Sequence, residues 1–405
     1  MAPFTVKWGI LATGGIAQSA AFSKDLLADP SARGTSDVVH EVVAAASSTL
    51  VERAAQFLKD VGAGADAKAY GSYAELVVDP NVDIIYVATP HSHHFQNVML
   101  ALEVGNKHVL CEKAFTVTAA QARKLVETAR KRNLFLMEAV WTRYFPLSVQ
   151  VRSLVQSGAI GTVYRVVADN SLNCNENHST TAAVTFPDTN RMVNLDLAGG
   201  ALLDLGIYSL TWLFQILYHL QPEAEGDKEV PQVLAAMNKY DRTGADESAT
   251  VVLLFPSHRS QGVGMTSMRV GTGVGSVQKS APAILIQGSD GEIQVMGPAY
   301  KPLAYRVIKK SDKKSESDVP WIDMPIPEDK REGAIWKGHG MFWEADEAAR
   351  CLRDGKKESA TLPLSESIVI METMDKALQQ GGIVYPELIT SDVFDKNSPL
   401  NTGKA

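Results

Sequence analysis

An aspartate and a tyrosine lie four residues apart in one apolar segment of the sequence. Asp204 and Tyr208 belong to the string Gly-Gly-Ala-Leu-Leu-Asp-Leu-Gly-Ile-Tyr at 199–208. The i, i+4 spacing places both side chains on one face of a helix. A carboxylate buried in such a helix needs a partner, and a lysine is a suitable one. These residue types support proton transfer, although a helix-capping aspartate and a core tyrosine with a satisfied hydroxyl fit the same pattern.

A candidate lysine follows a strand-like run at 107–111, in Cys-Glu-Lys-Ala at 111–114. We expect Glu112 and Lys113 to lie at the carboxyl end of a parallel strand, where doubly wound folds form their ligand crevice. Composition alone also allows Lys113 to be an ordinary exposed lysine. The interpretation as a catalytic group therefore depends on what else lies at that edge of the sheet.

One predicted strand earlier, three histidines follow an apolar run that ends at Thr89 and Pro90. No carboxylate or cysteine lies beside them with the spacing of metal ligands, so a metal site is disfavoured. We expect this segment to start the next helix and to border a bound cofactor. The residues predicted to do so are Thr89, Pro90, His91 and His94.

A dinucleotide fingerprint follows the first predicted strand. Ala12-Thr13-Gly14-Gly15-Ile16-Ala17 matches G-x-G-x-x-G/A with alanine at the first glycine. Gly14 would let the backbone approach a pyrophosphate, and the helix N-terminus would offer unpaired N–H groups to the phosphates. A tight strand-to-helix turn without a ligand is the alternative. The position of the motif at a first βα turn favours nucleotide binding.

The end of the second predicted strand indicates which dinucleotide is bound. An NAD site usually has an acidic residue there for the ribose 2′-OH. This chain instead has Ser47, Ser48 and Thr49, with Arg53 nearby and no acidic residue at the strand end. Hydroxyls and a guanidinium suit a 2′-phosphate, so the sequence predicts NADP. Arg53 could also simply face solvent.

The rhythm of the chain predicts an α/β fold in two parts. Up to Pro146, short apolar runs alternate with helical patterns, which is typical of βαβ units and a doubly wound parallel sheet. Later runs between 163 and 309 follow one another with turns, apart from a long helix expected at 200–217. This favours an α+β domain with an open, largely antiparallel sheet. We therefore predict domains at 1–146 and 147–405, with a disordered tail from Ser391.

Composition excludes several classes of protein. The 405 residues include 39 basic and 46 acidic side chains, a formal net charge of −7, which argues against a nucleic-acid binder. The three cysteines are far apart, which disfavours a disulfide scaffold, a zinc site or a dithiol centre. No signal peptide or membrane-spanning run is recognised, so we expect a cytoplasmic protein without a membrane partner.

Taken together, the glycine variant, Glu112-Lys113 and the Gly-Gly-x-x-x-Asp-x-x-x-Tyr string resemble the glucose–fructose oxidoreductase / inositol dehydrogenase (Gfo/Idh/MocA) family. The string Met-Glu-Ala-Val-Trp-Thr-Arg-Tyr-Phe-Pro at 137–146 resembles the branch that oxidises D-xylose or aromatic trans-dihydrodiols with NADP. The likeness covers most of the chain. Each motif is weak singly, but their order makes the match specific.

The resemblance implies a Rossmann domain and a second domain whose open sheet forms a homodimer. The family's Glu-Lys-Pro motif falls on Glu112, Lys113 and Ala114, so alanine replaces the usual proline. Its acid and final His or Tyr fall on Asp204 and Tyr208. The resemblance also implies that Trp141, Arg143 and Phe145 lie near the substrate, the first two near the cofactor as well. Polar residues of the following loop, Asn175 among them, would contact a sugar or form an ordinary loop.

The expected chemistry is loss of an O–H proton while hydride leaves the same carbon for the nicotinamide. A free tyrosine has a pKa near 10, and a nearby cation lowers it. We therefore expect Tyr208 to be the general base, Lys113 its electrostatic partner, and Asp204 the residue that orients the substrate or the lysine. An aldopyranose would be oxidised at C1 to the aldonolactone without a metal. Oxidation of a trans-dihydrodiol, and a non-catalytic NADP-sensing transcription regulator, remain alternatives.

Overall fold

The chain leaves its first structural unit near Trp141 and later returns to it. The computed structural model describes residues 2–13, 21–174, 186–222, 228–273, 281–312, 315–331 and 338–402. The first unit consists of Met1–Trp141, Ile326–Ile368 and Glu387–Ala405, and the second of Thr142–Pro325 and Val369–Pro386. This differs from the predicted division, which placed all of 147–405 in the second domain. The periodicity of the sequence predicts a helix near the end of the chain, but it does not show which of the two sheets that helix packs against.

The first unit contains a parallel sheet with the strand order β3-β2-β1-β4-β5-β6. Its strands are β1 (Phe4–Leu11), β2 (Val38–Ala46), β3 (Lys68–Tyr70), β4 (Ile84–Val87), β5 (His108–Glu112) and β6 (Leu136–Ala139). β4 and β6 are buried along their whole length, as strands covered on both faces must be. The predicted doubly wound sheet is confirmed. β3 was not predicted, because three residues are too few to show alternation.

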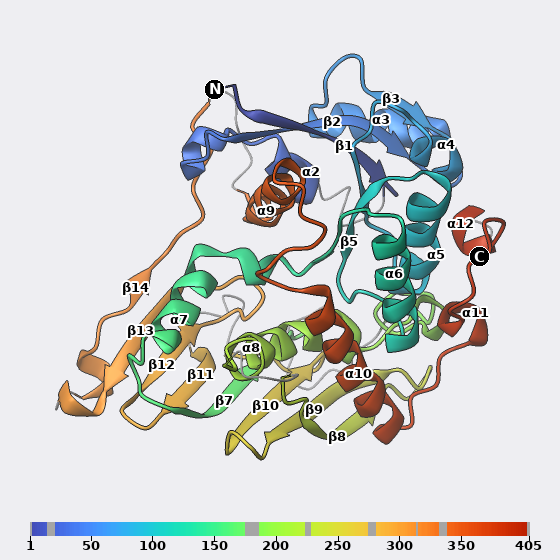
Figure 1. The fold of residues 1–405 in the computed structure, drawn as a ribbon. Coiled ribbons are helices and arrows are strands. Elements are labelled where there is room, and N and C mark those ends of the chain that lie inside the picture. Colours follow the sequence, from blue (N-terminus) through green and yellow to red (C-terminus); the bar gives the residue numbers. More distant parts are fainter. Residues whose placement is uncertain are drawn as a thin grey trace. The chain divides into compact units, whose positions relative to one another are not determined.

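Helices lie on both faces of this sheet (Figure 1). Trp8 of β1 packs against Phe22, whereas a Cβ on the next residue, Gly9, would meet Leu76 on the opposite side. Thr118 caps the helix that starts at Ala119 by accepting a hydrogen bond from the Gln121 N–H at 3.3 Å. The helices are α2 (Ala21–Leu26), α3 (Val51–Val61), α4 (Tyr73–Val77), α5 (His91–Met99) with a π-helical continuation (Leu100–Val104), α6 (Ala119–Lys131) and α9 (Phe342–Arg353).

A buried polar network attaches α9 to the first two strands. The Asp346 carboxylate accepts hydrogen bonds from Arg33, Thr35 and His40, each at 2.9 Å. The Trp8 indole N–H donates to the other ring nitrogen of His40 at 3.1 Å. Burial alone would raise the pKa of Asp346, but the bonds from His40 and Arg33 lower it to about 2. The returning segment is therefore part of the core of the first unit.

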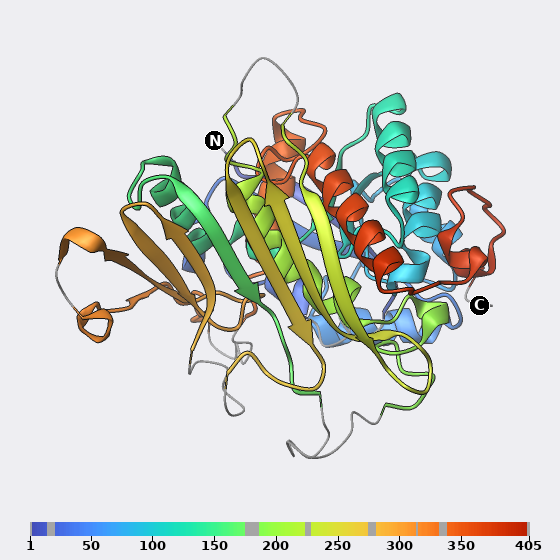
Figure 2. The ribbon, with the colours of Figure 1, turned by 90° about the horizontal axis from the view of Figure 1, so that it is seen from below.

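The second unit contains a mixed sheet with the order β14-β13-β12-β11-β7-β10-β9-β8 (Figure 2). Its strands are β7 (Val163–Asp169), β8 (Gln232–Lys239), β9 (Asp246–Phe255), β10 (Ser260–Ser267), β11 (Pro282–Gly288), β12 (Gly291–Met296), β13 (Ala304–Lys309) and β14 (Ile322–Asp323). Within the described residues, β7 runs parallel to β10 and the other neighbours are antiparallel. The predicted α+β architecture is confirmed.

Helix α8 (Ile207–Leu217) covers one face of this sheet and is entirely buried. The segment Leu195–Leu217 is long and apolar enough to cross a membrane, but its most apolar 18-residue stretch, with a mean hydropathy of 1.4, is 94% buried inside the protein. In the described part of the chain it is the core helix of the second unit. The other helices here are α7 (Pro146–Gln156) and α10 (Leu364–Gln380), whose first residues belong to the first unit.

The tail is ordered as far as residue 402, so the prediction of disorder from Ser391 was wrong. Helices α11 (Glu387–Thr390) and α12 (Pro399–Thr402) pack on α5. Asn97 donates to the Leu400 carbonyl at 3.1 Å, and Gln121 donates to the Ile389 carbonyl at 2.9 Å. Leu400 is buried as well. Polar composition predicted a solvated tail, but amides of α5 and α6 satisfy its backbone.

Candidate active site

The carboxyl ends of four strands meet at one edge of the parallel sheet. Leu11 pairs with Ala46 on one side and with Val87 on the other, and Val87 pairs with Cys111. The residues that follow these strands therefore emerge together. The strand order reverses between β1 and β4, which is the switch point where open α/β sheets bind ligands.

The fingerprint begins at this edge. Ala12 follows β1, donates its N–H to the Ala46 carbonyl at 3.2 Å, and has a φ of 82°. This is the left-handed conformation that glycine adopts most easily, at the position where the fingerprint usually has glycine. Thr13 follows it, whereas Gly14, Gly15 and Ile16 lie outside the described residues. Their role in binding a pyrophosphate stays a prediction.

The hydroxyl cluster after β2 leads directly into α3. Thr49 and Leu50 N–H groups both lie 3.4 Å from the Ser47 hydroxyl, and Ser48 follows Ser47 in the same turn. Leu50 occupies the N-cap position of α3 and provides no side-chain cap. Arg53 is exposed in the first turn of the helix. An uncapped helix N-terminus, three hydroxyls and a guanidinium form a suitable site for a phosphate group.

After β4, the chain turns into α5 at Pro90, and His91 is the first helical residue. His94 is fully buried between two loops, with Nε2 2.9 Å from the Thr89 carbonyl and Nδ1 2.9 Å from the Ala114 carbonyl. Burial lowers the pKa of His94 to about 4, although the hydrogen bonds with the backbone carbonyls oppose the shift. Within the described residues, no group of three potential metal ligands comes together.

The Thr89 hydroxyl provides a test of whether a ligand fits this edge. Its oxygen is buried and has no hydrogen-bond partner in the described part of the structure. A buried hydroxyl without a partner is unfavourable, so an additional donor or acceptor is expected to bind there. A nucleotide at the switch point would supply such a group.

Glu112 ends β5 at the same edge, Lys113 follows it, and both are buried. The Tyr86 hydroxyl of β4 donates a hydrogen bond to one carboxylate oxygen of Glu112. The Lys113 N–H donates to the other oxygen at 3.1 Å. Glu112 therefore fixes the backbone at Lys113.

The string at 137–146 marks the passage between the two units. Trp141 and Arg143 lie in a 3-10 helix (Trp141–Tyr144), and Phe145 precedes α7. Arg143 and Phe145 are fully buried, and the Arg143 carbonyl accepts a hydrogen bond from Arg152 at 3.0 Å. Trp141 contacts His339, with ring centroids 6.1 Å apart. Their predicted contacts with cofactor and substrate remain predictions, as does that of Asn175, which lies outside the described residues.

Asp204 and Tyr208 lie on the core helix of the second unit. Asp204 lies in a π-helical segment (Leu202–Gly206) and Tyr208 in α8. π-helical turns are frequent at functional sites. The Tyr208 ring contacts the Tyr300 ring at a centroid distance of 5.8 Å. The Trp212 indole donates to the Ala299 carbonyl at 2.9 Å and so fixes the segment that carries Tyr300.

Within the second unit, Asp204 forms an ion pair that the sequence did not reveal. Arg191 Nη1 lies 3.1 Å from Asp204 Oδ1, and the Arg191 side chain is half exposed while that of Asp204 is buried. The sequence argument considered only a lysine as the partner of this carboxylate. Arg191 follows the loop that is outside the described residues, and no local pattern marks it.

A second acid binds the N-terminal end of this helix. Asp246, the first residue of β9, is fully buried and accepts a hydrogen bond from the Leu202 N–H at 2.6 Å. Burial raises the pKa of Asp246 to about 6, although the backbone hydrogen bonds oppose the shift. This residue was also missed by the sequence argument.

Replacing Asp246 by asparagine should remove a pH dependence of stability. Because the pKa of Asp246 is higher in the folded protein than the ordinary 3.8, the folded state binds this proton more tightly than the unfolded chain. Ionisation therefore destabilises the fold as pH rises from about 4 to 6, by about 3 kcal/mol in full. Relative to wild type, the free energy of unfolding of Asp246→Asn should rise by this amount between pH 4 and pH 8. A difference that does not change with pH in urea titrations would contradict the prediction.

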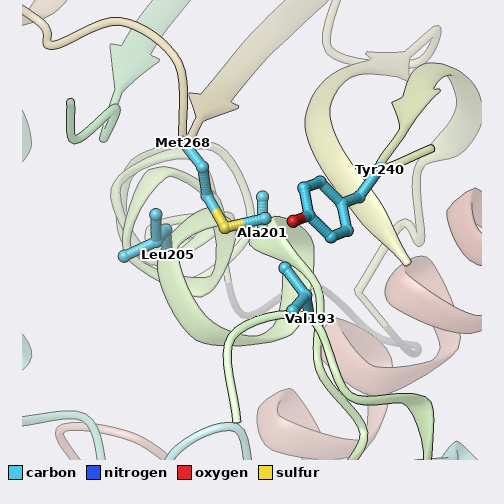
Figure 3. Packing of buried hydrophobic residues seen from close by; sticks show 5 residues of the cluster. All are labelled: Val193, Ala201, Leu205, Tyr240 and Met268. Atoms are coloured by element: carbon cyan, nitrogen blue, oxygen red, sulfur yellow. The ribbon is translucent and has the colours of Figure 1, made fainter. Parts of the chain in front are cut away.

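Apolar packing holds the other side of the same helix. Ala201 and Leu205 pack with Val193, Tyr240 and Met268 in a buried cluster (Figure 3). Asn170, which follows β7, donates to the Leu205 carbonyl at 3.0 Å. The helix segment before Tyr208 is therefore fixed by both packing and hydrogen bonds.

Comparison with known proteins defines the class to which this fold and these residues belong. Residues 6–140 match the model of an oxidoreductase family with an NAD-binding Rossmann fold, and residues 148–294 match the GFO/IDH/MocA C-terminal domain. The chain belongs to the GFO/IDH/MocA oxidoreductase family.

Individual relatives extend along the whole chain. A D-xylose 1-dehydrogenase (NADP(+)) from Hypocrea jecorina is 62% identical, covering 99% of this chain and 98% of the relative. Trans-1,2-dihydrobenzene-1,2-diol dehydrogenases from Xenopus tropicalis and Homo sapiens are each 33% identical. They cover 94% of this chain and 99% and 98% of their own lengths.

Solved structures share the fold at low sequence identity. An aldose-aldose oxidoreductase from Caulobacter crescentus has a TM-score of 0.70 and 19% identity, covering 93% of this chain and 98% of its own. An NAD binding oxidoreductase from Klebsiella pneumoniae has a TM-score of 0.71 and 18% identity, covering 93% and 96%. At this identity the likeness establishes the fold alone.

Proposed function

We propose that this protein is an NADP-dependent D-xylose 1-dehydrogenase, which oxidises the sugar at C1 to the aldonolactone. The observation that carries this proposal is the 62% identity with a D-xylose 1-dehydrogenase (NADP(+)) over 99% of the chain. The predicted Gfo/Idh/MocA resemblance is confirmed by both family models. An acidic residue that would repel a 2′-phosphate is missing from the end of β2, which fits NADP.

The residues at the sheet edge fit this cofactor. Thr13 and the following turn would hold the pyrophosphate, and Ser47, Ser48, Thr49 and Arg53 the 2′-phosphate. Thr89, Pro90, His91 and His94 would form the wall next to the nicotinamide half, with Glu112, Lys113 and Trp141. For Arg143, which belongs to the second unit, a contact with the cofactor is expected from the family resemblance alone. When bound, NADP supplies the nicotinamide ring that accepts a hydride from the substrate.

Replacing Arg53 by alanine should weaken NADP binding more than NAD binding. A charge-assisted hydrogen bond to phosphate contributes about 1.5–3 kcal/mol, so the Kd for NADP should rise about 10- to 100-fold. The Kd for NAD should change little, because its ribose carries no phosphate there. Isothermal titration of the purified protein with each nucleotide measures both constants.

Lys59 provides the matched control, because it is an exposed cation in the last turn of the same helix. Lys59→Ala removes the same charge from α3 without affecting the N-terminal turn. An equal loss of NADP affinity in both variants would show that Arg53 acts only through the general charge of the helix.

The proposed catalytic group is Tyr208, acting as a base on the C1 hydroxyl of the sugar. A cation near a phenol favours its ionised form, and we assign that role to Lys113. Asp204, which is held by Arg191 within the second unit, would accept a hydrogen bond from a neighbouring sugar hydroxyl. Proton removal at the hydroxyl and hydride loss from the same carbon together complete the oxidation.

The test is to follow NADPH formation with D-xylose, D-glucose, L-arabinose and a trans-dihydrodiol. The highest kcat/KM should be found with D-xylose. Oxidation of trans-dihydrodiols is the second candidate, supported by the relatives at 33% identity. A preference for the diol would replace the first proposal. Tight NADP binding without turnover of any of these substrates would favour a cofactor-sensing regulator.

We also propose that two copies of the chain associate through the open face of the second unit's sheet. One cross-strand row on that face is apolar over five strands: Leu234, Val252, Val263, Val167 and Leu285. These side chains are partly or largely exposed, and Leu234 is 59% exposed. A continuous apolar row on the face opposite α8 is an unfavourable surface for a monomer.

Size-exclusion chromatography with light-scattering detection should therefore give the mass of a dimer. Introducing arginine at the centre of the row, in Val263→Arg, should give a monomer. A monomeric wild-type protein would refute the proposed dimer.

We further propose a reducing, cytoplasmic compartment, with which the three free cysteines are consistent.

A further inference from the structure

We propose that Asp246 and Tyr385 are positioning residues, which set the start of the helix that carries Asp204 and Tyr208. The two residues enclose the turn at Gly199 and Gly200 in the second unit. This inference rests on the proposed roles of Asp204 and Tyr208 in the reaction. Asp246 and Tyr385 act on the backbone of this turn, at Leu202 and Gly199.

The contact with Asp246 fixes the first helical turn. Its carboxylate lies 2.6 Å from the Leu202 N–H, one of the N–H groups that a helix start leaves unpaired. The interaction comes from β9, 44 residues further along the chain, and not from a residue preceding the helix. The strand and the helix start are therefore held in a fixed relation, two residues before Asp204.

Both glycines are required by this arrangement. Gly200 has a φ of +141°, and a Cβ on it would lie 2.0 Å from Asp246 Oδ1. A Cβ on Gly199 would lie 2.7–2.8 Å from backbone atoms of Arg191 and Asn194. Gly200 thus lets the Asp246 carboxylate approach the helix end closely, and Gly199 lets the preceding loop pack against the same turn.

Tyr385 holds the same turn from another side. Its hydroxyl donates a hydrogen bond to the Gly199 carbonyl at 3.0 Å. The same hydroxyl would lie 3.4 Å from a Cβ on Gly200. Tyr385 comes from the segment Val369–Pro386 that returns to the second unit. Two distant parts of the chain therefore converge on one helix start.

The consequence is control over the register of the catalytic face. The apolar cluster of Ala201 and Leu205 in Figure 3 resists displacement sideways, but apolar contacts are not directional. The bonds to Leu202 and Gly199 are directional and fix rotation about the helix axis. A displacement of about 1 Å in a reacting group can lower a rate about 100-fold. Loss of Asp246 should therefore reduce turnover more than NADP binding.

Three variants of the full-length protein test this inference: Asp246→Ala, Asp246→Asn and Tyr385→Phe. Asparagine keeps an acceptor for the Leu202 N–H, so kcat should stay within about threefold of wild type. Alanine should lower kcat about 10- to 100-fold, with the Kd for NADP unchanged. If the alanine variant does not fold, Tyr385→Phe should still lower kcat severalfold. A folded alanine variant with wild-type kcat, or an asparagine variant as slow as alanine, would overturn the inference.

Thr118→Ala is the matched control, because it removes a helix cap in the first unit. It should lower the midpoint of thermal unfolding and leave kcat unchanged. If Thr118→Ala lowered kcat as much as Asp246→Ala, the loss would be a general effect of removing a helix cap, and a positioning role for Asp246 would be refuted.

A double-mutant cycle separates this inference from the proposed function. If Asp246 acts through the helix, Asp246→Ala should lower kcat by a smaller factor in the Tyr208→Phe background than in the wild-type background. If Tyr208→Phe keeps wild-type activity, the proposed role of Tyr208 fails. If Tyr208→Phe is inactive while the Asp246 effect is fully additive, only the positioning inference fails.

Discussion

Replacing Tyr208 by phenylalanine is expected to lower kcat for D-xylose by about 10²–10⁴-fold, the range of general acid–base catalysis. The substitution removes only the hydroxyl group that we propose as the base. The ring, which is buried and packs on Tyr300, keeps its contacts. The free energy of unfolding should therefore change little, and the loss should appear in kcat with little change in KM.

Stopped-flow absorbance of NADPH in a single turnover gives the chemical step directly. Tyr164→Phe removes a hydroxyl from a half-exposed tyrosine of the same unit and should keep wild-type kinetics. Titration with NADP should give the same Kd for both variants. Turnover near wild type in Tyr208→Phe would exclude Tyr208 as the base, and Tyr300 would be the next tyrosine to test.

The nucleotide-binding half of the protein was predictable because its signals are local. A strand, a glycine-rich turn and a helix follow one another at the start of the chain, and the later strands alternate with helices in the same way. The positions of Ala12, Ser47, Thr89 and Glu112 at one sheet edge follow from parallel pairing. The alternation of strands and helices is enough to predict such pairing.

The residues that support the catalytic helix could not be predicted in the same way. Asp246 binds a helix start 44 residues earlier. In the first unit, the contact of Asp346 with His40 across 306 residues was equally out of reach. Such contacts depend on how the units fold back, which local periodicity does not describe. Gly199 and Gly200 were the available signal, because adjacent glycines at a helix start indicate a close approach by another group. They did not identify Asp246 as that group.

Replacing Lys113 by methionine is expected to have the second large effect, a decrease in kcat of about 10²–10³-fold at pH 7. The unperturbed tyrosine hydroxyl ionises near pH 10, so a base without a neighbouring cation is almost fully protonated at neutral pH. Each unit by which the pKa of the base rises lowers the fraction of ionised base about tenfold. Methionine fills a similar volume at this buried position, so the fold should be retained.

The pH profile distinguishes this role from a simple loss of packing. In Lys113→Met, kcat/KM should continue to rise up to about pH 9–10, whereas in wild type it should already have reached its maximum at lower pH. Without the cation, the tyrosine hydroxyl loses its proton only at the higher pH. Lys113→Arg keeps the charge and should recover part of the rate at pH 7. Lys131→Met, at the exposed end of α6, is the control for loss of a lysine and should behave as wild type. A Lys113→Met profile parallel to that of wild type would mean that the lysine positions the substrate without changing the acidity of the base. Tyr208 would then need another cation to favour its ionised form. Arg191, which belongs to the same unit and is paired with Asp204, would be the first residue to replace.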